Sequence, residues 1–135
     1  MKPARLIVLG VAVLVGGGVV WWFAIRPAVQ RAKAKHDVDV LVLALDGFMR
    51  EQGEYPRGDV ATLCRLLKGQ TIGGQNLRGL DYVESQAYEV NAKGEFVDPW
   101  GTAYRIELNP VVHVYSCGPN RIDEQGNGDD IGSGQ

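Results

Sequence analysis

Apolar residues fill the first stretch of the chain without interruption. Leu6 to Ile25 are twenty residues without a charge, rich in valine and leucine, and they end in two tryptophans and a phenylalanine before Arg26. As a helix rising about 1.5 Å per residue, this run matches the bilayer hydrocarbon core, roughly 30 Å thick. Tryptophan is enriched at the membrane interface, which is where this run would end. We therefore expect residues 1–27 to form a single membrane-spanning segment.

A cleaved secretory signal is the alternative interpretation of this run. Such a signal has an apolar region of about 7–15 residues that ends in small residues at the cleavage site. Here the run is longer, and bulky aromatic residues precede Arg26-Pro27. A retained span is therefore favoured. Basic residues flank both ends of the run, so charge asymmetry alone does not orient it in the membrane.

Beyond Pro27 the apolar residues recur at intervals of three and four, which is the spacing of one helix face. These residues are Val29, Ala32, His36, Val40, Leu43, Ala44 and Phe48. Proline is tolerated at the membrane edge, and Gly53 is a typical helix terminator. We expect one long rod from about residue 4 to residue 52, in which residues 28–52 are amphipathic and begin a head domain of residues 28–135.

The head should combine a short helix with a small antiparallel sheet. After a turn signal at residues 53–56, Asp59 is placed to cap a helix that carries Val60, Leu63, Leu66 and Leu67 and stops near Gly69. Residues 69–80 are polar and glycine-rich, so we expect a surface loop. Candidate strands follow at residues 96–97, 104–108 and 111–115, and their short connections favour antiparallel pairing. A sheet packed on the amphipathic helix gives the α+β class.

Charge is divided unevenly along the chain. Residues 1–35 hold six basic residues and no acidic one, so the remaining hundred residues carry −8 to give the net charge of −2. Nucleic-acid binding requires clustered lysine and arginine to neutralise phosphates, and the acidic body lacks such clusters. The pattern excludes a nucleic-acid-binding head.

Acidic residues and glycines gather near the C-terminal end, in residues 115–131 (YSCGPNRIDEQGNGDDI). The run shows neither helical nor strand periodicity, and Arg121 is the single basic residue to offset four carboxylates. Oxygen-only, irregular sites of this kind suit Ca²⁺. The spacing does not match an EF-hand loop, and a solvated, disordered tail is the alternative. Against a tail, Ile131 is apolar and follows the acids directly, as if the chain returned to the core.

The other reactive side chains give weaker signals. Cys64 and Cys117 could form a disulfide in an oxidising compartment, but two separate buried thiols are favoured because sequence does not establish their proximity. His36 and His113 have no metal-binding spacing, so packing or surface roles are favoured. No nucleophile elbow or phosphate-binding loop is present in the sequence, and we expect no enzymatic activity, no small-molecule substrate and no catalytic residue.

Three motifs in the same order resemble a known family. They are Gly53-x-Tyr55-Pro56 after the long helix, Asp98-Pro99-Trp100-Gly101-x-x-Tyr104, and Tyr115-Ser116-x-Gly118-Pro119-Asn120 with a closing Gly128-Asp129-Asp130-Ile131. Residues 36–131 thereby resemble the major (G-type) pseudopilins of type II secretion systems. The resemblance implies a long helix, a small sheet and a structural Ca²⁺ in the C-terminal loop. It also implies a bacterial inner-membrane protein whose head lies in the periplasm, and assembly with other pseudopilins or secretion-machinery proteins into a filament.

Carried over residue by residue, the resemblance implies calcium ligands in the loop of residues 115–131. Ser116 and Cys117 would contribute backbone carbonyls, and Asn120 and Asp129 would contribute side chains, with Asp123 or Asp130 as a further ligand. Asn120 stands where the family often has aspartate, which reduces the charge at that ligand.

The N-terminal part departs from the family pattern. Family members carry a short basic leader ending in glycine, with glutamate at the fifth position after the cleavage site. Here neither Gly10 nor Gly18 is followed by an acid at that position, and the first acid is Asp37. Two expectations stay open: a divergent subunit that assembles without the glutamate, and an uncleaved membrane-tethered interaction module that builds no filament.

Overall fold

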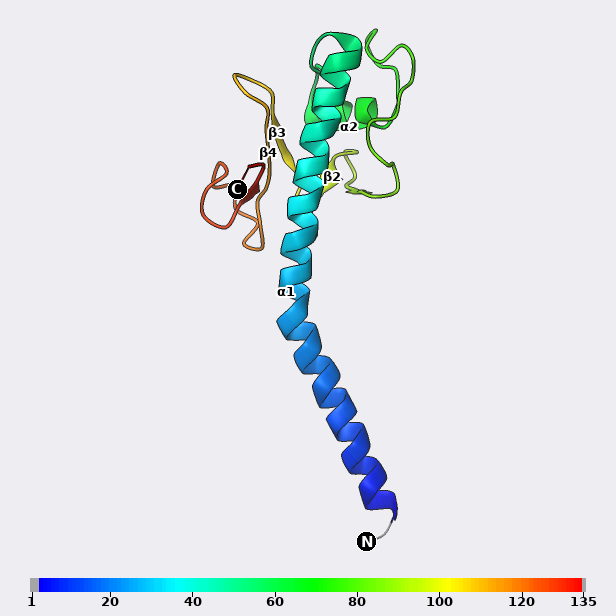
Figure 1. Cartoon of the computed structure of the whole chain (residues 1–135), viewed down its shortest axis with the longest axis vertical. Coiled ribbons are helices and arrows are strands. Elements are labelled where there is room, and N and C mark those ends of the chain that lie inside the picture. The colour runs from blue at the N-terminus through cyan, green and yellow to red at the C-terminus, as the bar shows by residue number, and fades with distance from the viewer. Residues whose placement is uncertain (1–2, 135) are drawn as a thin grey trace.

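The computed structural model describes the backbone of residues 3–134 and the side chains of residues 17–134. Its dominant element is α1 (Pro3–Gln52), a single helix of 50 residues that contains Pro27. Gly53 follows with φ of 82°, a left-handed conformation that glycine adopts at helix ends. The long rod is therefore confirmed. Figure 1 shows that the head packs on the second half of α1, while the first half extends away from it.

Over the described residues, no helix contains a stretch that is both long enough and apolar enough to cross a bilayer. The expected span at Leu6–Ile25 falls largely on residues 6–16, whose side chains lie outside the described part of the chain.

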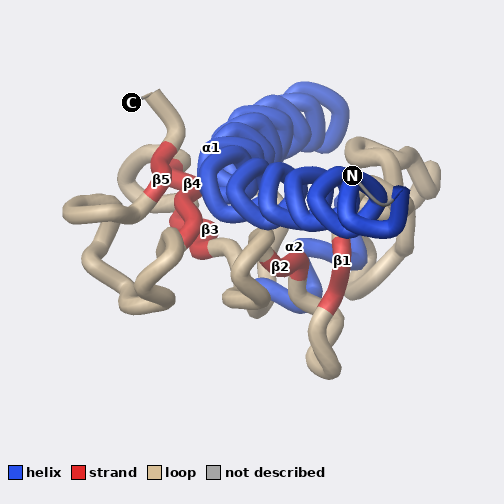
Figure 2. Tube along the Cα trace, turned by 90° about the horizontal axis from the view of Figure 1, so that it is seen from below, coloured by secondary structure: helices blue, strands red, loops and turns tan. Residues whose placement is uncertain are grey.

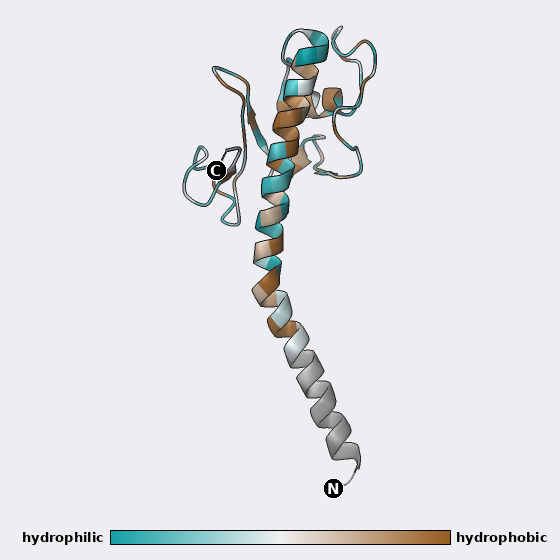
Figure 3. Cartoon of the chain, in the orientation of Figure 1, coloured by the Kyte–Doolittle hydropathy of each residue, from teal (hydrophilic) through white to brown (hydrophobic). Residues whose placement is uncertain are grey.

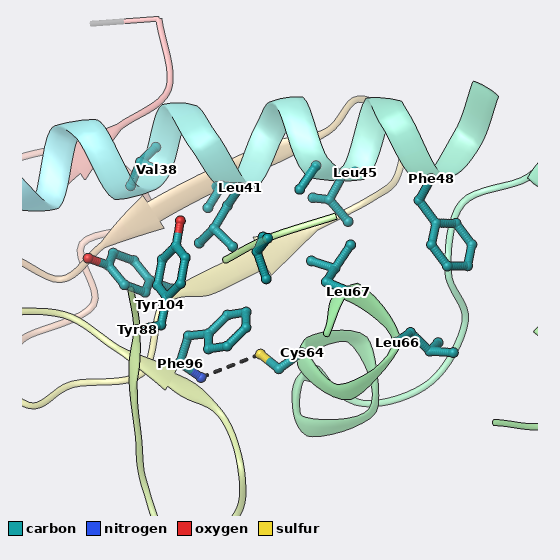
Figure 4. Packing of buried hydrophobic residues seen from close by; sticks show 13 residues of the cluster. Val38, Leu41, Leu45, Phe48, Cys64, Leu66, Leu67, Tyr88, Phe96 and Tyr104 are labelled. Atoms are coloured by element: carbon teal, nitrogen blue, oxygen red, sulfur yellow. Dashed lines mark hydrogen bonds between the residues drawn. The ribbon is translucent and has the colours of Figure 1, made fainter. Parts of the chain in front are cut away.

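The short helix α2 (Val60–Leu67) begins and ends where the sequence predicts. The Asp59 carboxylate accepts a hydrogen bond from the Thr62 amide at 2.8 Å, which satisfies one unpaired donor of the first turn. Cys64, Leu66 and Leu67 are fully buried. This face of α2 joins the core beside α1, as the close-up in Figure 4 shows.

The predicted surface loop between α2 and the strands is organised by a buried amide. The Asn76 side chain is fully buried and donates hydrogen bonds to the backbone oxygens of Leu66 (3.1 Å) and Leu80 (2.9 Å). Its Oδ1 accepts a third bond, from the Leu80 amide at 2.9 Å. The Asn76 side chain thus holds the loop against the end of α2 through these hydrogen bonds.

Two small antiparallel sheets complete the head. The first pairs β1 (Glu89–Val90) with β2 (Phe96–Val97), and the second has the order β3 (Arg105–Glu107), β4 (His113–Ser116) and β5 (Ile131–Gly132). Figure 2 shows both sheets on the same side of α1. The α+β class is confirmed, and the expected strands match β2, β3 and β4 to within two residues at each end. The strands β1 and β5 are additions that the sequence did not predict.

The core lies between α1, α2 and the sheets. From α1 it receives Val38, Leu41, Leu45 and Phe48, all fully buried. The helix face that the sequence predicted is therefore wrong in part, because Val29, Ala32, His36 and Leu43 are exposed while Ala44 and Phe48 are buried. The one acidic side chain within this helix face is Asp37, which is 4% exposed. Its carboxylate accepts a hydrogen bond from the Tyr104 hydroxyl at 2.8 Å and pairs with Lys33 at 2.6 Å. Burial, and then the neighbouring carboxylate, raises the pKa of Tyr104, so its hydroxyl keeps its proton.

Candidate metal centre

The acidic loop starts and finishes at one edge of the second sheet. Ser116 at the end of β4 pairs with Ile131 at the start of β5, so the two ends of the loop lie side by side. Gly118 has φ of 69°, and a Cβ there would overlap the backbone oxygen of Asp129. Glycine is required at this closure because any side chain would push the two ends apart. The loop is therefore a closed, ordered unit, and the disordered-tail alternative is wrong.

Three carboxylates converge inside this loop. Glu124, Asp129 and Asp130 each offer an oxygen, and these oxygens all lie within 4.8 Å of one another. Asp130 is buried, and the other two are half-buried. Two unit charges at this separation repel by about 3 kcal/mol at an effective dielectric constant of about 20. Such a cluster needs positive charge nearby to be held closed.

Backbone amides supply part of that compensation and fix the orientation of the carboxylates. The Oδ2 atom of Asp130 accepts hydrogen bonds from the amides of Glu124 (3.0 Å) and Gly126 (2.8 Å). The Oδ2 atom of Asp129 accepts from the Asn120 amide at 3.1 Å, and the Glu124 carboxylate accepts from the Asp129 amide at 3.0 Å. Each carboxylate is therefore held by the loop's own backbone.

The carboxylate oxygens that accept no hydrogen bond indicate a place for a ligand. Within residues 17–134, the Oδ1 atoms of Asp129 and Asp130 are buried without any hydrogen-bond partner. A buried, unsatisfied carboxylate oxygen is costly, and such atoms in a folded protein normally face an ion or water. A hard cation bound by oxygens would satisfy both atoms and remove the repulsion in the cluster. The donor set is all carboxylate on an irregular loop, which fits Ca²⁺.

Asp123, expected as a further ligand, is not one of the three converging carboxylates, and its ligand role stays a prediction. Its Oδ1 atom accepts a hydrogen bond from the Tyr115 hydroxyl at 3.0 Å, and its Oδ2 atom pairs with Arg105 at 3.1 Å. The hydrogen bond from the Gln125 amide, then the hydrogen bond from the Tyr115 hydroxyl and the positive charge of Arg105, lower the pKa of Asp123. Asp123 thus joins the loop to β3 and β4.

The other predicted ligands lie around the base of the loop. The Ser116 hydroxyl donates to the buried Asp98 carboxylate at 2.6 Å and accepts from the Gly118 amide at 3.0 Å. The Asn120 side chain is exposed, and its oxygen accepts from the Ile122 amide at 2.7 Å. The Cys117 thiol is buried, which raises its pKa. The metal-ligand roles of Ser116, Cys117 and Asn120 stay predictions.

Sequence reasoning missed Glu124. It follows Asp123 directly in the same acidic run, and two adjacent residues in a loop without periodicity do not reveal which one points inward. The glycine at position 128 is linked to the inward position of Glu124, because a Cβ at Gly128 would overlap the Glu124 carboxylate. That requirement is visible only once the loop is folded.

The two cysteines are free, so the expectation of separate buried thiols is confirmed. Cys64 lies on α2, where its sulfur accepts a hydrogen bond from the Phe96 amide at 3.4 Å, drawn in Figure 4. Cys117 lies at the start of the acidic loop.

Comparison with solved structures found a similar protein of known structure. The chain is similar to the crystal structure of the major pseudopilin from the type 2 secretion system of enterohaemorrhagic Escherichia coli, with 25% sequence identity and a TM-score of 0.56. The match covers 80% of this chain and 85% of the pseudopilin. No family model matches the chain, and no curated protein matches it. The chain therefore has a pseudopilin-like fold, in agreement with the three sequence motifs.

Proposed function

We propose that this pseudopilin-like chain is a non-enzymatic, structural component of a type II secretion system or a related type IV filament system. The observation that carries the proposal is the shared architecture over 80% of the chain, a long helix with a small head on its second half. Such a helix leaves its first half available to neighbours, which is the arrangement a filament or membrane-anchored subunit needs. Its partners would be other pseudopilins or secretion-machinery proteins.

The proposal includes a single membrane span and a periplasmic head on the bacterial inner membrane. The twenty uncharged residues from Leu6 to Ile25 support it. The aromatic residues at the end of this run support it as well. Trp21, Trp22 and Phe23 are 61%, 52% and 75% exposed, so more than half of each side chain is uncovered. Exposed aromatic side chains in a row are typical of a membrane interface or a subunit contact.

The proposal also includes a structural Ca²⁺ in the head. Glu124, Asp129 and Asp130 would hold it, and the two unpartnered oxygens of the aspartates support this assignment. When bound, the ion would neutralise the cluster and fix the loop between β4 and β5. Because α1 packs against both of these strands, the ion would also strengthen the attachment of the sheet to the helix.

A membrane-tethered interaction module is the second candidate. It is favoured by the absence of an acid among residues 1–36, because the family uses a glutamate near the start of the helix to direct packing into the filament. The two candidates predict different assemblies in the membrane.

Cross-linking in membranes separates them. Membranes from expressing cells would be treated with an amine-reactive cross-linker, and detergent-solubilised protein at equal concentration would be the control. A filament subunit gives a ladder at multiples of the monomer mass, which is 14.7 kDa for the uncleaved chain, in membranes and not in detergent. A tether gives the monomer alone or one band with a different protein. The sequence of the N-terminus in the same sample would show whether a mature end lies within the apolar run, as filament entry predicts.

A further inference from the structure

A groove lies where the head meets the part of α1 that extends beyond it. Its volume is about 350 Å³, and its walls include Trp22 and Arg26 of α1, Trp100 from the turn between β2 and β3, and Arg121 from the acidic loop. The Gln30 side chain donates a hydrogen bond to the Pro99 backbone oxygen at 3.4 Å, which links the two walls. Segments far apart in sequence thus form one concave surface.

The groove carries positive charge over an aromatic floor. The Arg26 guanidinium lies 4.9 Å above the Trp22 ring, and neither Arg26 nor Arg121 forms an ion pair within residues 17–134. The acids nearest to Arg121 in sequence are engaged elsewhere, since Asp123 pairs with Arg105 and the Glu124 carboxylate converges with Asp129 and Asp130. Two guanidinium groups without carboxylate partners are therefore free to bind an anion.

The position of the groove along α1 indicates which kind of anion would reach it. Arg26 is the first charged residue after the uncharged run, so a span at residues 6–25 would place it at the level of the lipid headgroups. Trp100 and Arg121 line the same groove and would lie at that level too. Figure 3 shows brown, hydrophobic bands on the described part of α1 below the head, where no other segment covers the helix. The groove would thus open between the head and the membrane surface.

We propose that this groove binds the phosphate headgroup of an anionic phospholipid in the membrane that holds α1. Arg26 and Arg121 donate hydrogen bonds to the phosphate oxygens, and Trp22 and Trp100 contact the glycerol and the upper acyl chains. The inference rests on the proposed function, because it needs the first half of α1 to lie in a bilayer. One lipid would bridge the helix and the acidic loop, and it would set how the head stands on the membrane.

Tryptophan fluorescence in vesicles tests this proposal. Replacing Trp21 and Trp22 by phenylalanine leaves Trp100 as the single tryptophan of the full chain, and phenylalanine keeps an aromatic ring at position 22 in the wall of the groove. The protein is reconstituted in three parts phosphatidylcholine to one part phosphatidylglycerol, with bromine on the acyl chains of either lipid. We expect stronger quenching of Trp100 by brominated phosphatidylglycerol than by the same mole fraction of brominated phosphatidylcholine, because the groove enriches the anionic lipid next to Trp100.

Charge variants separate lipid binding from general proximity to the membrane. Arg26→Gln and Arg121→Gln should each reduce the preference for phosphatidylglycerol about fivefold, the effect of one basic residue near an anionic surface. Arg121→Lys retains the charge and should retain most of the preference. Arg50→Gln is the matched control, because it removes the same charge from the same helix about 36 Å away and should change nothing.

The outcomes distinguish this inference from the proposed function. Equal quenching by both lipids, or a preference that survives both glutamine variants, overturns the lipid site. A companion variant with Trp21 as its single tryptophan reports on the span itself. If Trp21 is quenched and Trp100 is not, the lipid site is wrong while the membrane anchor stands. If neither is quenched, the membrane anchor fails and the lipid site with it.

Discussion

Removing the Asn76 side chain should destabilise the head more than any other single polar substitution in its loops. Asn76→Ala eliminates three hydrogen bonds, to the Leu66 oxygen and to both backbone groups of Leu80, at 2.9–3.1 Å. A net contribution of about 1 kcal/mol per bond gives a loss of about 3 kcal/mol in the free energy of unfolding. Asn76 also has φ of 51°, where alanine costs about 1 kcal/mol more than asparagine.

The assay is denaturant unfolding of the full chain in micelles, followed by the near-ultraviolet circular dichroism of the head's aromatic residues. Asn76→Gly tolerates the positive φ, so it should lose about 3 kcal/mol from the missing hydrogen bonds alone. Asn76→Asp keeps the acceptor for the Leu80 amide and should be less damaging. Gln70→Ala is the matched control, because this exposed amide has no comparable bonds. A loss below about 1 kcal/mol for Asn76→Ala would refute the reasoning.

Three further predictions concern single groups. Tyr104→Phe removes the hydroxyl that donates to the buried Asp37 carboxylate at 2.8 Å, so we expect denaturant unfolding to show a loss of about 2 kcal/mol, and an unchanged midpoint would contradict this. Burial raises the pKa of the Cys64 thiol to about 11, so a thiol reagent should label it far more slowly in the folded than in the denatured chain, and equal rates would argue against the packing of α2. The pKa of Asp123 is lower in the folded than in the unfolded chain, so its contribution to stability is present above its unfolded pKa, about 3.9, and is lost as the pH falls below that value. Acid unfolding measured for Asp123→Asn should therefore depend less on pH in this range than for the wild type.

Local patterns predicted the helices and most of the second sheet because neighbouring residues determine those elements. The Asp59 cap and the short apolar runs at residues 104–108 and 111–115 are visible in short windows. The spacing of apolar residues predicted the helix α1 but not which of its faces packs on the head. The strands β1 and β5 were missed because each is two residues long and has no period of its own. They exist because a partner strand lies beside them, which is a tertiary effect.

The sequence predicted the position of the acidic loop but only part of its set of candidate metal ligands. The acids, the glycines and the apolar Ile131 located the loop after a strand and before a return to the core, although the closing strand β5 was not predicted. The Asp123 carboxylate pairs with Arg105 of β3 and accepts a hydrogen bond from Tyr115 of β4, whereas Glu124 joins the cluster. Arg105 lies outside the run of residues 115–131, so the run itself could not show which of the two adjacent carboxylates joins the cluster.

Thermal unfolding of the full chain in micelles, with Ca²⁺ and with a chelator, tests most directly whether the loop holds a structural cation. At a free Ca²⁺ concentration about 100 times the dissociation constant, linkage predicts a gain of about 2.7 kcal/mol. For a head of this size the gain corresponds to a rise in melting temperature on the order of 10–20 °C.

Two variants assign the effect of Ca²⁺ to the loop. Asp130→Asn should abolish most of the rise, because it removes a charge and one of the two unpartnered oxygens. Glu84→Gln, an exposed acid outside the loop, should retain the rise. Wild-type melts that coincide with Ca²⁺ and with chelator, or an Asp130→Asn variant that responds as fully as the wild type, would contradict the account.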